Sequence, residues 1–201
     1  MILIGYSGHG FVACSILKTA GSIVIAYCDN EEKKYNPFQL QYLGTEDSEL
    51  ARQAFEKNAI FIGIGNNVIR QKVFEKFHND CFQIANAIHP SSIICTSAAI
   101  ANKGVMLGAK STIQPLAKIA NGVICNTGCI IEHECVVDAF SHIGPGAILC
   151  GNVHVGEGSF IGAGAVVRQG ITIGKNCIVG AGAVVVNDIP DFSKVVGIPA
   201  R

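Results

Sequence analysis

Residues 148–185 read ILCGNVHVGEGSFIGAGAVVRQGITIGKNCIVGAGAVV, and in this stretch an aliphatic residue returns at every sixth position. The same period extends toward the N-terminus, and thirteen of its fourteen positions are aliphatic, the exception being a cysteine. These positions are Leu107, Ile113, Ile119, Cys125, Ile131, Val137, Ile143, Leu149, Val155, Ile161, Val167, Ile173, Val179 and Val185. A six-residue period sustained over this length predicts a parallel β-helix.

A second, smaller side chain lies two positions before most of these aliphatic residues, as at Ser141, Ala147 and Ala165. Two inward side chains per hexad would fill a narrow prism, and glycines such as Gly144 and Gly162 follow the aliphatic residue where the chain turns a corner. If three hexads form one coil, the β-helix has about five coils stacked about 4.8 Å apart. The period alone does not give the handedness.

The N-terminal half has a different pattern, in which strand-like and helix-like stretches alternate. We expect strands at residues 1–4, 22–27, 59–64 and 82–88, and helices at residues 11–19, 46–57 and 67–77. Strands separated by helices indicate a small parallel sheet of the Rossmann-like type. The sequence therefore predicts two domains, an α/β domain at residues 1–90 and a parallel β-helix at residues 91–201.

A glycine-rich turn, GYSGHG at residues 5–10, follows the first expected strand. Its glycines are spaced GxxGxG, which differs from the GxGxxG fingerprint of dinucleotide-binding folds. Backbone N–H groups at the start of a helix suit a pyrophosphate, so a nucleotide site is one interpretation of this turn. The other is a tight strand–helix turn without a ligand.

Composition excludes several classes of protein. Lys plus Arg equals Asp plus Glu at 15 each, so no electrostatic footprint for nucleic acid or an anionic membrane is present. Nine cysteines without CxxC spacing argue against a disulfide framework or a zinc ribbon, and indicate buried thiols in a reducing compartment. No apolar run is long enough to span a membrane and the chain does not start like a signal peptide, so we expect a cytoplasmic protein.

Several motifs together resemble a known family. Besides the hexads and residues 5–10, they are GIGNN at residues 63–67, NT at residues 126–127, IEHEC at residues 131–135 and the closing VGIPAR at residues 196–201. Over essentially its whole length the chain resembles the sialic acid O-acetyltransferase family of hexapeptide-repeat acyltransferases. Within that family it is most similar to the N-acetyltransferases of UDP-4-amino-4,6-dideoxy-N-acetylglucosamine, on the route to bacillosamine. The resemblance implies that the β-helix is left-handed.

The resemblance also implies that the glycine turn binds a nucleotide sugar rather than NAD. The implied substrate-binding residues are Ser7, Gly8, His9, Asp29, Asn30 and Gly65, with Asn126 helping to position the substrate. Many members of the family carry a small residue at the position of Tyr6, which leaves open what this side chain does to the nucleotide pocket.

His133 is the candidate general base for acetyl transfer, because a histidine titrates near neutrality. It occupies neither inward position of its hexad, so we expect it to project from an edge of the prism. A neighbouring carboxylate would raise the basicity of the ring. The residues alone do not decide between Glu132 and Glu134, and the resemblance favours Glu134.

The resemblance implies acetyl-CoA as the co-substrate, with no metal. His142, Gly151, Ala163 and Ala181 match positions that contact the coenzyme. It also implies a homotrimer whose active sites lie between subunits, because an outward-facing edge by itself offers no deep cleft. Outward apolar residues fit a buried contact surface, and they are Ile130, Val136, Ile148, Phe160 and Val166.

Four other functions match parts of the sequence. O-acetylation of sialic acid or a related sugar, or N-acetylation of a GDP-linked amino sugar, would use the same fold and base on a different acceptor. An NAD-dependent oxidoreductase is suggested by the glycine turn with Asp29 about twenty residues on, but residues 1–90 are too short for a full dinucleotide fold. A zinc hydratase needs three converging imidazoles, and the spacing of His142 and His154 does not favour one.

Overall fold

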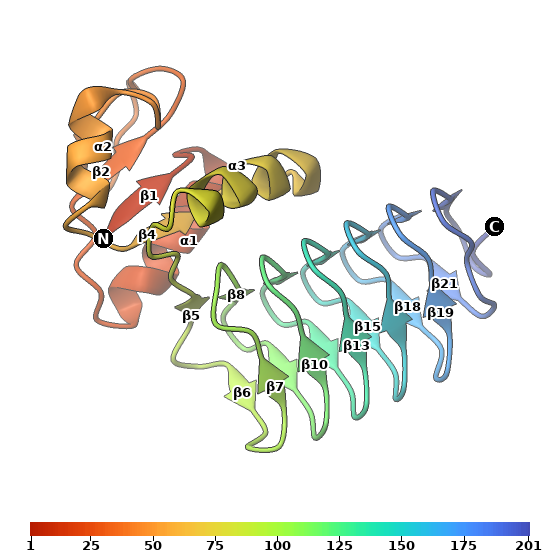
Figure 1. Cartoon of the computed structure of the whole chain (residues 1–201). Helices are drawn as coiled ribbons and strands as arrows, with labels where there is room; N and C mark the ends of the chain where they lie inside the picture. The colour runs from red at the N-terminus through yellow and green to blue at the C-terminus, as the bar shows by residue number, and fades with distance from the viewer.

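The computed structural model describes residues 1–201 and shows two parts (Figure 1). An α/β domain lies at one end of a long prism of stacked coils, and the C-terminus lies at the other end. No helix in the structure combines the length and the apolar character that crossing a membrane requires. All nine cysteines are free thiols; six are buried as expected, whereas Cys81 is exposed and Cys95 and Cys150 are partly exposed.

The N-terminal domain is a four-stranded parallel sheet with helices on both faces. Its strands are β1 (Ile2–Ile4), β2 (Ala26–Cys28), β3 (Gln41–Tyr42) and β4 (Ile60–Ile62), in the order β3-β2-β1-β4. Its helices are α1 (Gly8–Thr19), α2 (Glu49–Phe55) and α3 (Asn67–Asn79). α2 and α3 pack against one face of the sheet, and α1 is sandwiched between the other face and the β-helix. The predicted Rossmann-like arrangement is confirmed.

One expected strand is interrupted. Ile84 forms a single bridge to Ile60 of β4, whereas β5 (Ala87–Ile88) pairs with β8 (Met106–Leu107) of the β-helix. Three residues further along the chain, the same apolar run therefore changes sheets. β3 was not expected, because its two residues lie in a polar stretch.

The C-terminal part is a left-handed parallel β-helix with three flat faces. The face covered by the N-terminal domain consists of β5, β8 (Met106–Leu107), β11 (Ile124–Cys125), β14 (His142–Ile143), β17 (Phe160–Ile161), β20 (Ile178–Val179) and β22 (Lys194–Val195). The second face consists of β6 (Ile93–Ile94), β9 (Thr112–Ile113), β12 (Ile130–Ile131), β15 (Ile148–Leu149), β18 (Val166–Val167) and β21 (Val184–Val185). The third face consists of β7 (Ala99–Ile100), β10 (Lys118–Ile119), β13 (Val136–Val137), β16 (His154–Val155) and β19 (Thr172–Ile173). The five complete coils agree with the predicted number.

The predicted inward positions form the core of the prism. All fourteen are buried, from Leu107 to Val185, and they join the smaller inward residues in one apolar cluster. From β8 to β18 each strand pairs with the strand 18 residues further on, as Ile124 pairs with His142. Because these coils repeat one register, a residue's position in its hexad and coil fixes both its direction and its face.

The corners of the prism depend on two kinds of backbone position. Every sixth residue from Gly104 to Gly182 has a positive φ, and Glu134 is one of the non-glycine residues that adopt it. The glycine after an inward aliphatic residue is needed for stacking, since a Cβ on Gly144 would lie 2.6 Å from the carbonyl oxygen of Ile161 on the next coil.

The second face presents a stripe of outward apolar residues, Ile93, Ile130, Ile148, Val166 and Val184. The other two expected contact residues, Val136 and Phe160, lie on the third and the covered face.

Candidate active site

The surroundings of the three glycines in the first turn show why each position is occupied by glycine. Gly5 has a φ of +87°, and a Cβ on Gly10 would lie 2.2 Å from the carbonyl oxygen of Gly5, so both are required by the protein's own backbone. A Cβ on Gly8 would meet nothing within 4 Å. Gly8 therefore leaves open space at the start of α1, where a ligand can approach the backbone.

The start of α1 is free to bind an anion. Ser7 is the N-cap residue, but its side chain caps no backbone N–H, and the first turn of the helix carries no acidic residue. The positive end of the helix dipole and the unpaired N–H groups thus face solvent. This arrangement fits the pyrophosphate of a nucleotide sugar.

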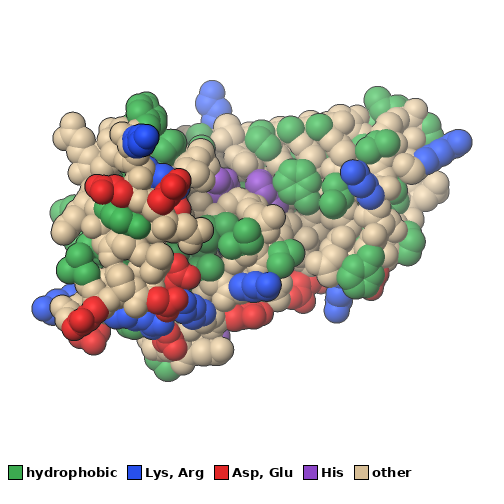
Figure 2. Space-filling view, turned by 90° about the horizontal axis from the view of Figure 1, so that it is seen from above, with side chains coloured by type: hydrophobic (Ala, Val, Ile, Leu, Met, Phe, Trp, Pro, Cys, Tyr) green, Lys and Arg blue, Asp and Glu red, His purple; other side chains and the backbone are tan.

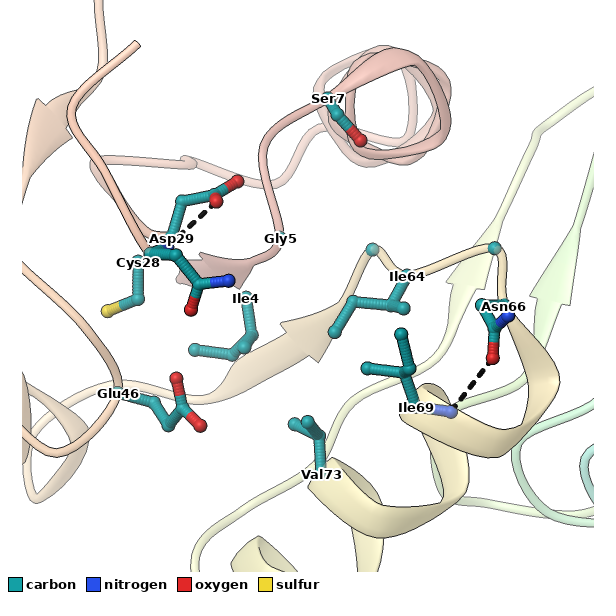
Figure 3. Close-up of a pocket in the computed structure, with 13 residues that line it drawn as sticks. Ile4, Gly5, Ser7, Cys28, Asp29, Glu46, Ile64, Asn66, Ile69 and Val73 are labelled. Carbon is teal, nitrogen blue, oxygen red and sulfur yellow. Dashed lines mark hydrogen bonds between the residues drawn. The ribbon is translucent and has the colours of Figure 1, made fainter.

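A pocket of about 360 Å³ opens beside this turn (Figure 3). It is bounded by the carboxyl ends of β1, β2 and β4, by the loop before α2 and by the first turns of α3. Its lining residues are Ile4, Gly5, Ser7, Cys28, Asp29, Asn30, Glu46, Gly63, Ile64, Gly65, Asn66, Ile69 and Val73. Four of the expected substrate-binding residues, Ser7, Asp29, Asn30 and Gly65, are brought together here. Gly8 and His9 are not part of the lining.

Asp29 and Tyr6 shape this pocket from behind. The two carboxylate oxygens of Asp29 accept hydrogen bonds from the backbone N–H groups of Tyr6 and Asn30, both at 2.8 Å, and Lys33 Nζ lies 3.1 Å away. The Tyr6 side chain is fully buried, stacks on Tyr27 and donates a hydrogen bond of 2.7 Å to Asn36. Tyr6 therefore holds the loop after β2 and does not narrow the nucleotide pocket.

Two neutral histidines meet at the junction of the domains. The rings of His9 and His142 are 5.8 Å apart, and histidine side chains are visible in this valley in Figure 2. Burial lowers the pKa of His9 to about 4 and that of His142 to about 3, with the positive charge of Arg70 adding to both shifts. The expected outward direction of His142 is correct, but the N-terminal domain covers it and leaves the residue 8% exposed. Asn126 Nδ2 lies 3.1 Å from His142 Nε2, so the ring accepts there.

Arg70 joins the two domains and was missed by the sequence interpretation. It is 1% exposed and its guanidinium donates to the carbonyl oxygens of Gly122 and Phe140 in the β-helix, at 2.8 and 2.7 Å. It also donates to the carbonyl oxygens of Ile64 and Gly65 in the pocket wall, at 3.2 and 3.1 Å. Burial lowers its pKa to about 9, so Arg70 stays charged at neutral pH. A lone arginine on a helix gives no sequence signal for such a role.

His133 and Glu134 lie together on another edge of the prism, between the second and third faces. Glu134 Oε2 is 3.1 Å from His133 Nδ1, and no hydrogen bond joins Glu132 to the ring. The imidazole lies over Gly151 of the next coil, where a Cβ would come within 2.5 Å of Nε2. In a single chain 58% of the His133 side chain is exposed.

The expected site residues thus fall into two groups within one chain. His133, Glu134 and Gly151 occupy the edge between the second and third faces, which lies opposite the covered face. The other group lies on or beside the covered face and comprises the nucleotide pocket, His9, Asn126, His142, Ala163 and Ala181. The prism separates the two groups, so one chain alone does not bring the expected base to the expected nucleotide pocket.

Comparisons with known proteins place the chain in a family. Residues 1–77 match the PglD N-terminal domain, and residues 152–187 match the bacterial transferase hexapeptide repeats. A histidine-to-asparagine variant of perosamine N-acetyltransferase from Caulobacter crescentus, in complex with CoA and GDP-perosamine, is 35% identical, with a TM-score of 0.93 over 100% of this chain and 94% of that chain.

Two further solved structures are similar over the whole chain. The acetyltransferase domain of PglB from Neisseria gonorrhoeae, in complex with acetyl coenzyme A, is 34% identical, with a TM-score of 0.90 over 100% of this chain and 97% of that chain. WeeI from Acinetobacter baumannii is 26% identical, with a TM-score of 0.87 over the same shares. The chain therefore belongs to the hexapeptide-repeat sugar N-acetyltransferases with a PglD-type N-terminal domain, a family of acetyl-CoA-dependent enzymes, which confirms the predicted enzyme class and co-substrate.

Proposed function

We propose that this protein transfers an acetyl group from acetyl-CoA to the 4-amino group of a nucleotide-linked amino-deoxy sugar, with His133 as the general base. The observation that carries this proposal is the His133–Glu134 pair. Donation of the Nδ1 proton to Glu134 Oε2, 3.1 Å away, leaves the lone pair on Nε2, which faces Gly151 and open space. A fixed tautomer with an accessible Nε2 is what a proton-accepting histidine needs.

In this reaction His133 Nε2 takes a proton from the sugar amine as its nitrogen attacks the thioester carbonyl. The C–N bond forms, the C–S bond breaks, and the imidazolium returns its proton to the leaving thiolate. Glu134 stabilises the imidazolium and keeps the ring oriented. Gly151 leaves room for the ring, and Ala163 and Ala181 lie one coil apart on the edge next to the covered face, where small side chains leave space for an extended pantetheine arm.

Two nucleotide-linked acceptors fit this reaction. The sequence resemblance favours UDP-4-amino-4,6-dideoxy-N-acetylglucosamine, whereas the perosamine enzyme binds a GDP-linked amino sugar. O-acetylation of sialic acid fits less well, because the open N-terminus of α1 and the adjoining pocket suit a nucleoside diphosphate. Acetyl-CoA and nucleotide sugars are cytoplasmic metabolites, which supports action in the cytoplasm on a precursor of a bacterial glycan.

We further propose that the working enzyme is a homotrimer in which each active site is shared by two subunits. His133 and the nucleotide pocket lie on opposite sides of the prism, so each needs the complementary half from another copy. The apolar stripe on the second face lies beside the His133 edge and offers a contact surface. A cleft between two prisms would also exclude water from the thioester.

An acceptor panel tests the reaction class. We expect CoA release, followed with a thiol reagent, to require a nucleotide-linked sugar bearing a free 4-amino group. The same nucleotide sugars with a hydroxyl at that position, and free sialic acid, should be inactive. Turnover should be unchanged in EDTA, because the proposed chemistry uses only side chains. Rapid acetylation of free sialic acid would instead support the O-acetyltransferase alternative.

Mixed oligomers test the shared site. We expect His133→Ala and Ile69→Trp to be nearly inactive separately, the first lacking the base and the second having a filled nucleotide pocket. Ile69 lines that pocket from α3 and is 52% exposed, so the larger side chain should not disturb folding. Co-expressed chains should regain about a quarter of the wild-type rate, because random pairing restores both half-sites at one interface in four.

The matched control co-expresses His133→Ala with the double variant, which carries both substitutions in one chain and therefore supplies no working His133. No recovery is expected there. Light scattering should give the mass of three chains. A fully active species at the mass of one chain would contradict the shared site.

A further inference from the structure

The nucleotide pocket has two chemically different ends (Figure 3). At one end lie Gly5 and Ser7 of the glycine turn, beside the start of α1. Glu46 and Val73 lie at the end away from Ser7, where Ile64 and Ile69 add apolar walls. Phosphates belong at the first end, so the flat apolar base of the nucleotide belongs between the walls at the second, with Glu46 beside it.

Glu46 is the carboxylate in this pocket that still has an oxygen free for a ligand. Lys76 Nζ lies 3.4 Å from its Oε1, and Oε2 accepts no hydrogen bond from the protein. Asp29, the other acidic lining residue, already uses both of its oxygens, one on the N–H of Tyr6 in the turn after β1 and one on the N–H of Asn30 after β2. The Glu46 carboxylate points into the pocket in Figure 3, and its charge adds to the burial that raises the pKa of the Cys28 thiol to about 12.

A carboxylate accepts hydrogen bonds and donates none, so it distinguishes bases by their edges. Guanine presents two adjacent donors, N1–H and the 2-amino group, which match the two oxygens of a carboxylate. Uracil presents N3–H between two carbonyl oxygens, which a carboxylate repels. Adenine and cytosine each place a ring nitrogen that accepts directly beside their amino group.

The geometry points to guanine as the base that this enzyme selects, with Glu46 accepting hydrogen bonds from N1–H and the 2-amino group. The acceptor is then a GDP-linked amino sugar, and Glu46 is a specificity-determining residue. This inference rests on the proposed function, since it concerns the same nucleotide pocket. Lys76 holds Glu46 in place through the ion pair.

Calorimetric titration with GDP, UDP and IDP tests the inference, because IDP is GDP without the 2-amino group. We expect the wild type to bind GDP about 10–100-fold more tightly than UDP, the range for one bidentate base contact, with IDP between the two. Glu46→Gln should weaken GDP binding by about the same factor and should not weaken UDP binding, because it removes the repulsion between the carboxylate and the uracil carbonyl oxygens. The matched control is Asp47→Asn. Asp47 also pairs with Lys76, with 2.6 Å between Oδ2 and Nζ, but it does not line the pocket.

The outcomes separate this inference from the proposed function. If UDP binds as tightly as GDP or more tightly, or if Glu46→Gln leaves the GDP affinity unchanged, guanine selection is overturned. Acetylation of a UDP-linked amino sugar in that case leaves the proposed function intact. If none of the three nucleotides binds and no nucleotide-linked amino sugar is acetylated, the proposed function fails as well.

Discussion

Replacing His133 by alanine is expected to lower kcat by at least about 10²-fold, the scale for losing a general base. KM for both substrates should change little, because the imidazole acts on the amine proton and the nucleotide is held elsewhere. The fold should survive, since the side chain is outward and 58% exposed. Steady-state kinetics together with circular dichroism would show both results.

Two further variants are compared with His133→Ala to show that the loss of rate is specific to this residue. His154→Ala is the matched control, because His154 is also an exposed histidine paired with a carboxylate, Asp138 at 2.8 Å, but lies on the third face. We expect a rate near wild type. Glu134→Gln should cost less than His133→Ala, because the base is retained and only the charge of its partner at Nδ1 is lost. A His133→Ala enzyme with the wild-type rate would make the assignment wrong and His142 the next candidate.

Replacing Arg70 by methionine is expected to destabilise the protein by about 3 kcal/mol or more, because it strands buried carbonyl oxygens that now receive charge-assisted hydrogen bonds. Those oxygens belong to Gly122 and Phe140 on the β-helix and to Ile64 and Gly65 in the pocket wall. The lost contacts cross the domain junction. We therefore expect urea unfolding to split into two transitions, the N-terminal domain unfolding first.

Two comparison variants test whether the loss of stability is specific to the buried guanidinium of Arg70. Arg52→Met removes ion pairs to Asp47 and Asp80 on the surface of the N-terminal domain, and such pairs contribute about 0–1 kcal/mol. Arg70→Lys retains the charge but not the fork of donors, and should recover only part of the stability. A single unfolding transition at the wild-type midpoint for Arg70→Met would contradict the linking role.

The sequence was most informative where one local rule repeats. The inward hexad positions and the number of coils followed from the period alone, because each coil stacks on an identical register. The same period gave the direction of His142 relative to the prism but not its burial, since it carries no information about what packs outside. The expected strand at residues 82–88 failed for a related reason: an apolar run does not say which of two adjoining sheets it will join.

Single residues with unusual surroundings were beyond sequence reasoning. In the sequence Arg70 looks like any solvated arginine of a helix. Its partners Gly122 and Phe140 are distant in the chain and meet it only in the folded structure. The sequence predicts Glu46 at the start of a helix, whereas the structure places it in the loop before α2, and only the folded positions of Ile69 and Val73 show that it borders a pocket. The choice of Glu134 over Glu132 as the partner of His133 agrees with the 3.1 Å contact, and its positive φ explains how a neighbour in sequence reaches the ring.

The stacking register of the β-helix determines the face on which every later residue lies, much as a reading frame determines every later codon. Each coil advances the chain by the 18 residues that separate Ile124, His142 and Phe160 on the covered face. Losing six residues would keep the interior aliphatic, yet would rotate every later residue onto the neighbouring face. A loss of this kind between Glu134 and His142 would leave a stable prism whose two half-sites no longer meet across an interface. Over evolutionary time, then, such a chain can lengthen or shorten within its catalytic region only by whole coils.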